Sequence, residues 1–376
     1  MDTQHPLQLL GGLSPRQFMK RHWQKKPLLI RQAIPGFKPL LDRAALFALA
    51  AREEVESRML SQGPKGWQLR HGPFERRAFP SLKTPDWTML VQGVDLHDDA
   101  VHALMQQFRF VPDARLDDVM ISYATDGGGV GPHFDSYDVF LLQAHGQRRW
   151  RIGRQKDLSL VEGLPLKILA NFQPEDEYLL DPGDMLYLPP RWAHDGVAVG
   201  ECMTYSIGFR QPGRGELARE LLQRLAEDAE HAAGTAVYRD PGQPAVDSPG
   251  GIPPGMMAFA RDALQAVLDD PVELQCLLGE YLSEPKANVW FDGAAQGTMP
   301  TRMGGVTLDR RSRMMFDDQH IFINGESYRA SGRDALLMRR LADQRRLSAA
   351  EVARASQGAR HLIANWLEAG WIHDDQ

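Results

Sequence analysis

Two short motifs near the middle of the sequence carry residue types that bind transition metals. One is Gly-Gly-Gly-Val-Gly-Pro-His-Phe-Asp at 127–135, and the other is Asp-Pro-Gly-Asp-Met-Leu-Tyr-Leu-Pro-Pro-Arg-Trp-Ala-His at 181–194. His133 and Asp135 are two residues apart, so both side chains point to one side of an extended strand. His194 follows a strand interrupted by prolines, which can bring it to the same sheet. Two histidines and one carboxylate form a facial triad with open coordination positions, the arrangement of non-haem Fe(II) oxygenases.

The two motifs are more specific together than either is alone. A lone His-x-Asp is common by chance, but here Gly-Pro-His-x-Asp precedes Gly-Asp-x-Leu-x-x-Pro-Pro-x-x-x-His among predicted strands. The remaining histidines show no ligand spacing; they include His97, His102, His145, His231, His320 and His361. His133, Asp135 and His194 are therefore the predicted ligands of a catalytic iron.

The elements that must position these residues are short strands. From residue 117 the apolar period becomes two, with Val119, Ile121 and Tyr123 on one side. Further strands are expected at 137–143, 148–152, 185–188 and 203–209, the first two joined by a turn at His145-Gly146. Many short strands with frequent turn signals predict a mainly β catalytic domain, a small double-sheet jelly roll.

The flanking segments are expected to be mixed before the strands and helical after them. Ser14-Pro15-Arg16-Gln17 has the form of a helix start with a capping box. The other elements expected before residue 117 are a strand at 28–31, helices at 40–52, 86–92 and 100–108, and a strand at 67–70. Those expected after residue 212 are helices at 216–232, 256–268 and 272–282, strand-like runs at 296–329, and helices at 334–345, 348–355 and 359–369.

This pattern divides the chain into three expected domains. Residues 1–212 form the catalytic domain with its core at 100–212, residues 213–285 a helical segment, and residues 286–376 a winged-helix domain. Leu217, Leu221, Leu225 and Ala229 make an amphipathic stripe in the helical segment, suited to internal packing or to a dimer seam.

Composition is that of a globular protein without a basic surface. The chain has 376 residues, of which 43% are hydrophobic and 24% charged, and its formal net charge is -6. The region 301–376 has twelve arginines against ten acidic residues, so its winged helix lacks the basic footprint of a DNA reader.

Two distant cysteines fit a reducing compartment. With neither a signal peptide nor a membrane span in the sequence, we expect a cytoplasmic protein.

Several motifs resemble those of JmjC-domain oxygenases, which use 2-oxoglutarate. The resemblance is closer still to the bacterial ribosomal oxygenases, which hydroxylate an arginine of large-subunit ribosomal protein L-sixteen. The motifs that carry the resemblance are His133-Phe-Asp135, Gly146 to Trp150, Pro182 to His194, Tyr205 to Arg210, His22 to Pro27 and Arg70 to Phe74. The resemblance covers most of the chain and implies the same order of jelly roll, helical segment and winged helix.

The resemblance also implies roles for two further residues. The distal carboxylate of 2-oxoglutarate needs a fixed cation, and the candidate is Arg148, whose guanidinium can pair bidentately with a carboxylate. Many JmjC enzymes have lysine here, so the charge is kept while the residue type differs. Ser122, on the neighbouring strand, can donate a second hydrogen bond. The implied reaction decarboxylates 2-oxoglutarate to succinate and carbon dioxide while hydroxylating an unactivated carbon.

An arginyl substrate would need an acidic or aromatic clamp near the metal. Asp118 and Tyr137 lie on suitable strands, although a solvated acid and a packing tyrosine explain them equally well. The expected partners are a ribosomal protein of the large subunit and, from the resemblance, a second copy of the chain in a homodimer.

Other functions stay open from the residues alone. A histidyl, lysyl or asparaginyl target would leave much the same metal motif. A cupin-like dioxygenase that needs no 2-oxoglutarate, or a metal-binding winged-helix interaction protein with a relic barrel, would also keep parts of the pattern. The cupin-like dioxygenase would not need Arg148 for activity, whereas the 2-oxoglutarate enzyme would. Salt-dependent DNA binding would favour the winged-helix interaction protein.

Overall fold

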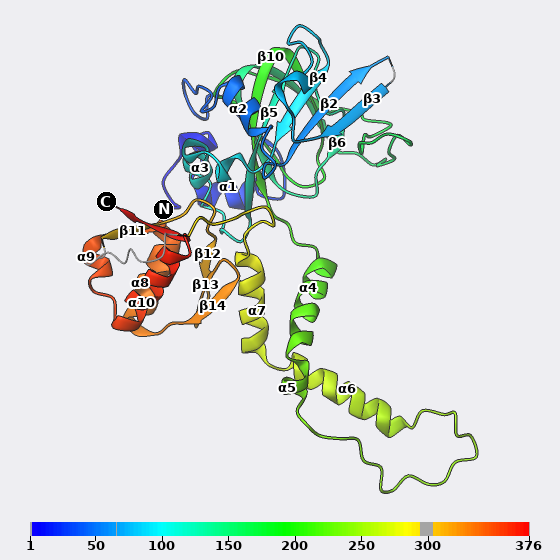
Figure 1. Cartoon of the computed structure of the whole chain (residues 1–376). Helices are drawn as coiled ribbons and strands as arrows, with labels where there is room; N and C mark the ends of the chain where they lie inside the picture. Colours follow the sequence, from blue (N-terminus) through cyan, green and yellow to red (C-terminus); the bar gives the residue numbers. More distant parts are fainter. Residues whose placement is uncertain (1, 65, 294–303, 376) are drawn as a thin grey trace. The chain divides into compact units, whose positions relative to one another are not determined.

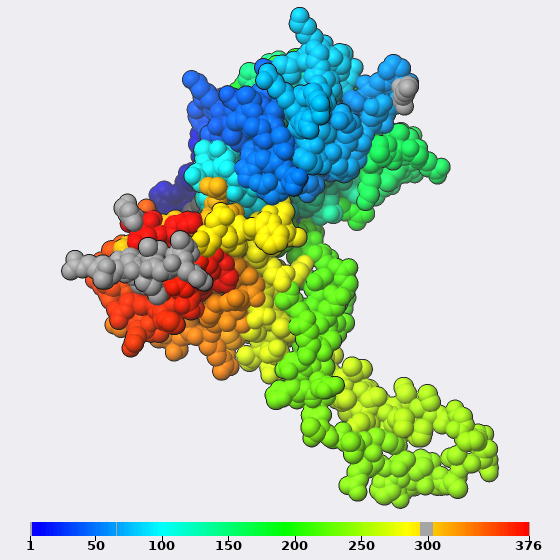
Figure 2. Space-filling model, viewed as in Figure 1, coloured from blue at the N-terminus to red at the C-terminus, as the bar shows by residue number. Residues whose placement is uncertain are grey.

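The computed structural model describes residues 2–64, 66–293 and 304–375, which divide into two compact units, Met1–Gln211 and Pro212–Gln376 (Figure 1). Each unit has a hydrophobic core of its own. The candidate site lies in the first unit. Figure 2 shows one face of this unit, where the blue and cyan segments before residue 100 are prominent.

The described part of the first unit contains one antiparallel sheet of ten strands in the order β1-β9-β7-β10-β5-β4-β2-β3, with β6 paired to β10 and β8 to β7. The strands are β1 (Leu28–Ile30), β2 (Ser57–Gly63), β3 (Gly66–His71), β4 (Trp87–Val91), β5 (Leu116–Ala124), β6 (His133–Phe134), β7 (Val139–Gly153), β8 (Asp176–Leu180), β9 (Met185–Leu188) and β10 (Ala193–Phe209). The sequence predicted most of them, but not β2, β4 or β8.

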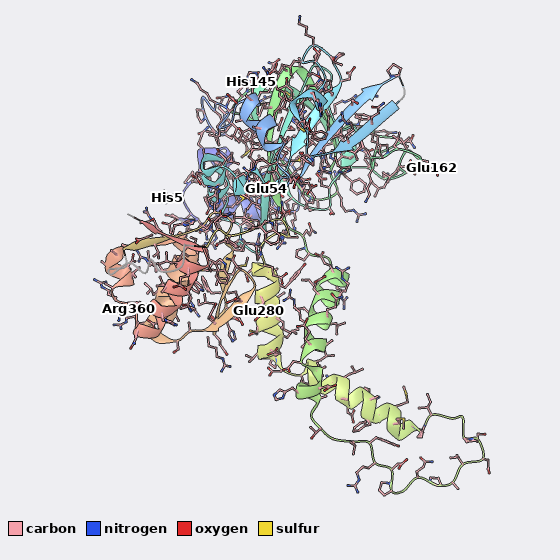
Figure 3. The ribbon with its side chains drawn as sticks, viewed as in Figure 1. His5, Glu54, His145, Glu162, Glu280 and Arg360 are labelled. Carbon is pink, nitrogen blue, oxygen red and sulfur yellow. The ribbon has the colours of Figure 1, made fainter. Side chains whose placement is uncertain are left out.

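Strands β7 and β10 are long and belong to both layers of the jelly roll. The first half of β7 pairs with β9 and its second half with β8, while the register between β7 and β10 shifts near Val199 and Met203. Gly146 has φ +57, and a Cβ there would lie only 2.0 Å from the Glu201 carbonyl oxygen. The prediction of two strands joined by a turn was wrong, because β7 runs without interruption from Val139 to Gly153, through Gly146. His145, labelled in Figure 3, is exposed beside it.

The two faces of the larger layer have different partners. One face packs with the helices α1 (Pro15–Arg21), α2 (Arg43–Leu49) and α3 (Asp99–Gln106) in the main core, where Phe18, Phe140 and Tyr187 are buried. The other face carries Val139, Leu141, Leu186 and Leu188, which form a cluster with Trp150, Ile152 and Leu180 of the smaller layer. Short 3-10 turns cover Gln8–Leu10, Arg76–Ala78 and Val94–Leu96. The space between the layers therefore has an apolar lining.

Two helix predictions in the first unit had opposite outcomes. The capping box at Ser14 is confirmed, since the Gln17 N–H donates to its hydroxyl at 3.2 Å and the Gln17 amide accepts the Ser14 N–H at 3.0 Å. The helix expected at 86–92 was wrong. The segment is strand β4, buried along its whole length and paired with both β2 and β5. A strand buried on both faces reads as a continuous apolar run, which periodicity cannot distinguish from a helix.

The second unit begins with helices and ends in a winged helix. Its helices are α4 (Arg214–Glu227), α5 (Ala229–Ala233), α6 (Pro254–Leu268), α7 (Pro271–Ser283), α8 (Gly332–Gln344), α9 (Ala349–Val352) and α10 (Gln357–Glu368). Its strands are β11 (Gly305–Leu308), β12 (Met314–Phe316), β13 (His320–Ile323), β14 (Glu326–Arg329), β15 (Arg346–Leu347) and β16 (Ile372–Asp375). The helix expected at 216–232 is interrupted at Asp228, so Ala229 starts a separate helix.

Asn324-Gly325, a dipeptide typical of tight hairpin turns, joins strands β13 and β14, in which Ile323 lies opposite Glu326. A second capping box begins α9, where the Ser348 N–H donates to the Glu351 carboxylate at 2.9 Å. Of the strand-like runs expected from residue 296, the part at 296–303 lies outside the described residues. None of the helices in the described segments combines the length and apolar character needed to cross a membrane.

Candidate active site

The three predicted metal ligands meet in the smaller layer of the jelly roll. His133 in β6 lies directly opposite His194 in β10, and their ring centroids are 4.3 Å apart. Asp135 follows β6, with a carboxylate oxygen 3.6 Å from the His194 Nε2. One ligand atom from each of the three residues lies within 4.8 Å of the others. This donor set, two imidazoles and one carboxylate, fits a transition metal bound on one face.

Backbone carbonyls fix the orientation of both imidazole rings. The Nδ1 of His133 is 2.9 Å from the carbonyl oxygen of Gly131, and the Nδ1 of His194 is 3.0 Å from that of Trp192. A carbonyl oxygen only accepts, so each Nδ1 carries the hydrogen and donates it. Each Nε2 then keeps its lone pair for a metal, the usual role of such outer hydrogen bonds.

Residues 189–192 link the second motif to the first. The Arg191 N–H, at a residue with φ +65, donates to the carbonyl oxygen of Asp135 at 2.7 Å.

His194 is buried, and burial together with the neighbouring His133 lowers its pKa to about 4, although the Asp135 carboxylate acts in the opposite sense. The ring is therefore neutral near pH 7, the form that binds a metal.

Arg148 lies on the same face as the predicted ligands. In the β7–β10 pairing, Ile152 is opposite His194 and Arg148 is opposite Ala198, so all four side chains share a face. Arg148 is only 5% exposed, and its Nη1 donates to the Ser122 hydroxyl at 3.3 Å. Its Nε and Nη2 have no hydrogen-bond partner among the described residues. Buried guanidinium donors without partners call for an anion, and a carboxylate suits their fork geometry.

Trp150 stands between the histidines and Arg148, and sequence reasoning gave it no role. Its ring centroid is 5.8 Å from that of His194, and the Arg148 guanidinium lies 5.6 Å from its ring. Gly196 is opposite Trp150, and a Cβ at Gly196 would lie 2.5–2.8 Å from three of the indole carbons. Real Cβ contacts are not this short, so a glycine at 196 lets the indole lie flat on β10.

Gly196→Ala should consequently disturb the surroundings of Arg148 more than the fold. We expect the added methyl group to displace Trp150, at a cost of about 1–3 kcal/mol for overpacking, and to weaken anion binding at Arg148. Gly63→Ala is the control, because its Cβ would meet nothing within 4 Å. Calorimetry and titration with 2-oxoglutarate measure the two effects. Unchanged titration of the Gly196 variant would show that Trp150 does not shape the pocket.

The remaining predicted residues lie around this centre. Ser122 is buried, and its hydroxyl is 3.4 Å from the Thr204 carbonyl oxygen, a weak bond that it would give up to donate to a ligand. Asp118 is buried in β5 and accepts the Gly93 N–H at 3.1 Å, so it is not a solvated acid. Tyr137 is 40% exposed. Partial burial and the charges of Asp135, Asp118 and Asp117 raise its pKa, which puts the phenol close to these carboxylates.

Comparison with known proteins identifies the family. Residues 103–217 match the model of the JmjC domain, and residues 266–373 match that of the ROXA-like winged helix. The chain is 34% identical over 336 residues to the ribosomal protein uL16 3-hydroxylase of Escherichia coli, covering 85% of this chain and 86% of the relative. The chain belongs to the ribosomal oxygenase family. A probable ribosomal oxygenase of Haemophilus influenzae is 37% identical over 210 residues, 54% of this chain and 52% of that protein.

Solved structures of the ribosomal oxygenase family agree with the fold over nearly the whole chain. The crystal structure of Escherichia coli ycfD has a TM-score of 0.84 at 29% identity and covers 95% of this chain and 97% of its own. Another structure, YcfD in complex with cobalt and 2-oxoglutarate, has a TM-score of 0.81 at 28% identity and covers 97% of this chain and 99% of that one. The fold class expected from the sequence, a JmjC jelly roll followed by helices and a winged helix, is confirmed.

Proposed function

We propose that this ribosomal oxygenase is an Fe(II)- and 2-oxoglutarate-dependent dioxygenase that hydroxylates an arginine side chain of the large-subunit ribosomal protein uL16. One observation carries the proposal: the His133, Asp135 and His194 donors converge on the face that also holds the buried, partly unpartnered guanidinium of Arg148. The relative named as a uL16 3-hydroxylase and the solved complex with cobalt and 2-oxoglutarate support the same reaction class.

His133, Asp135 and His194 would hold the metal through two Nε2 atoms and one carboxylate oxygen. Iron bound there supplies the reaction with dioxygen, because three protein ligands leave other positions open. The protein contributes the orientation of the ligands: the carbonyls of Gly131 and Trp192 fix the two rings. The Arg191 N–H fixes the backbone of Asp135.

Arg148 and Ser122 would bind the distal carboxylate of 2-oxoglutarate. Arg148 is four residues from the position opposite His194, roughly 13 Å along an extended strand, a span that an arginine side chain and a five-carbon diacid can share. The apolar cluster around Trp150 keeps water from this space. Overall, the substrate C–H, dioxygen and 2-oxoglutarate give the alcohol, succinate and carbon dioxide, so one oxygen atom enters each organic product.

Asp118 and Tyr137 would receive the guanidinium of the substrate. The carboxylates of Asp135, Asp118 and Asp117 make the surroundings of the phenol negative. Burial and these charges raise the pKa of Tyr137, so its hydroxyl stays protonated. A cationic side chain is therefore favoured over a neutral one beside the metal. A histidyl target, the alternative left open by the sequence, gains less from this negative charge when its imidazole is neutral.

The domain limits and the assembly are part of the proposal. We assign residues 1–212 to catalysis, 213–285 to dimerisation and 286–376 to a winged helix that contacts protein more than nucleic acid. Exposed apolar residues in the helical segment support a homodimer; they include Leu222, Met257, Leu264 and Leu268. Sedimentation equilibrium tests the homodimer. A ribosomal substrate also implies a cytoplasmic enzyme.

A coupled assay tests the proposed reaction. The chain is loaded with Fe(II) without oxygen and then given 2-oxoglutarate, dioxygen and an arginine-containing uL16 peptide. We expect succinate release that the peptide stimulates, and a peptide with lysine in place of the arginine should give little stimulation. No turnover by a chain shown to hold iron would refute the proposal.

A further inference from the structure

The connection between β6 and β7 carries two residues of the proposed site and one residue that points away from it. Asp135 lies beside His194 and Tyr137 is exposed, whereas Asp138 is completely buried. A buried carboxylate is costly unless hydrogen bonds compensate for the lost water. The partners of Asp138 therefore decide how firmly the connection is held.

Asp138 is held by groups from four separate segments. The Tyr187 hydroxyl in β9 donates to Oδ1 at 2.5 Å, and the Gln24 Nε2 donates to Oδ2 at 3.1 Å. The Arg115 Nη2 is 3.4 Å from Oδ2, and the Phe209 N–H donates to the Asp138 carbonyl oxygen at 3.1 Å. Both the side chain and the backbone of Asp138 are thus fixed to the core.

Gln24 belongs to the motif at 22–27, which the metal and co-substrate sites leave unexplained. Its backbone has φ +54, and its N–H donates to the Tyr187 hydroxyl at 2.8 Å. Trp23 stacks on Tyr187 at 6.0 Å, and the Arg115 guanidinium lies 5.5 Å from the Trp23 ring. A non-glycine residue keeps a left-handed backbone only where its surroundings hold it. The motif therefore forms a clamp on Tyr187 and Asp138.

We propose that Gln24 and Asp138 are positioning residues that hold the 135–138 connection, and with it Asp135 and Tyr137, in place for metal and substrate. The inference rests on the proposed function for its substrate part. Its metal part depends only on the geometry of the three ligands. A misplacement of reacting groups by about 1 Å can cost on the order of 100-fold in rate, so a small loosening of the connection is measurable.

The test compares Gln24→Ala and Gln24→Glu with a matched control, Gln32→Ala. Gln24 and Gln32 are both exposed and both left-handed, with φ +54 and +50. The Gln32 amide also donates to a buried aspartate, Asp184, at 3.3 Å, but on the turn before β9. Gln24→Ala removes the donor to Asp138, and Gln24→Glu puts a like charge beside it. Circular dichroism and thermal unfolding confirm that each variant folds.

Two properties of each variant are measured: its affinity for Co(II), from the absorption spectrum of the bound metal, and its steady-state turnover of the peptide. For Gln24→Ala we expect Co(II) affinity to fall about 10-fold, the lower end for loss of an outer-shell partner. We also expect a higher peptide KM and more succinate released per hydroxylated peptide. Gln24→Glu should show larger changes, and Gln32→Ala should match the unsubstituted chain.

Equal Co(II) affinity and equal peptide KM in the folded Gln24 and Gln32 variants would overturn the positioning role. If the unsubstituted chain shows no turnover at all, the proposed function fails. The Co(II) comparison then still decides whether Gln24 and Asp138 position the ligand Asp135.

Discussion

Replacing Asp135 with alanine should abolish turnover, with succinate formation lowered on the order of 1000-fold or more, as for other residues that act as one catalytic unit. The reason is charge: the variant leaves two neutral imidazoles, which hold a divalent metal more weakly than a triad with a carboxylate. The ligand atoms already lie within 4.8 Å of one another, so the site is preformed and its loss is not a folding effect.

Asp181→Ala is the matched control for this variant. Asp181 is exposed on the turn before β9, where it accepts a hydrogen bond from Gln147 at 2.7 Å. Peptide-stimulated succinate release and Co(II) absorption are recorded for both variants. An Asp135 variant that binds Co(II) as tightly as the control and still turns over would remove the carboxylate from the proposed triad.

The second large effect is expected at Arg148. Arg148→Gln should raise the KM for 2-oxoglutarate about 100-fold, because a hydrogen bond to a charged partner contributes up to about 3 kcal/mol. The KM of Arg148→Lys should lie between those of the unsubstituted chain and Arg148→Gln, since lysine keeps the charge but not the planar fork. The unpartnered Nε and Nη2 atoms are the groups expected to meet the carboxylate.

Arg149→Gln controls for a general effect of charge on β7. Arg149 is the next residue on the strand, is exposed, and pairs with Glu177 at 2.8 Å. Initial rates at varied 2-oxoglutarate concentration give the KM for each variant. Undiminished activity of Arg148→Gln without added 2-oxoglutarate would favour the cupin-like dioxygenase that does not use this co-substrate.

The three predicted metal ligands could be identified from the sequence because each of the two motifs fixes the position of its own residues locally. The His133-x-Asp135 spacing keeps both side chains on one side of the chain, and the proline-interrupted strand before His194 leads directly into β10. Alternation likewise predicted β5, and capping residues predicted the start of α1. These signals lie within a few residues of one another, so a single sequence contains them.

Features that depend on packing between distant segments were not predictable in the same way. Strand β4 was mistaken for a helix because both of its faces are covered by other parts of the chain. The place of Trp150 depends on Gly196, forty-six positions later in the sequence. The clamp that Gln24 forms on Asp138 joins residues 114 positions apart. Trp150 and Gln24 lie in motifs that carry the family resemblance, Gly146 to Trp150 and His22 to Pro27, but their partners Gly196 and Asp138 were visible only in the fold.

The most direct test of the central claim is tandem mass spectrometry of uL16 isolated from cells that contain either the unsubstituted chain or its His133→Ala variant. We expect one added oxygen atom on an arginine residue of uL16 in the first case and none in the second. The same oxygen present with both chains, absent with both, or found on a residue other than arginine would contradict this expectation.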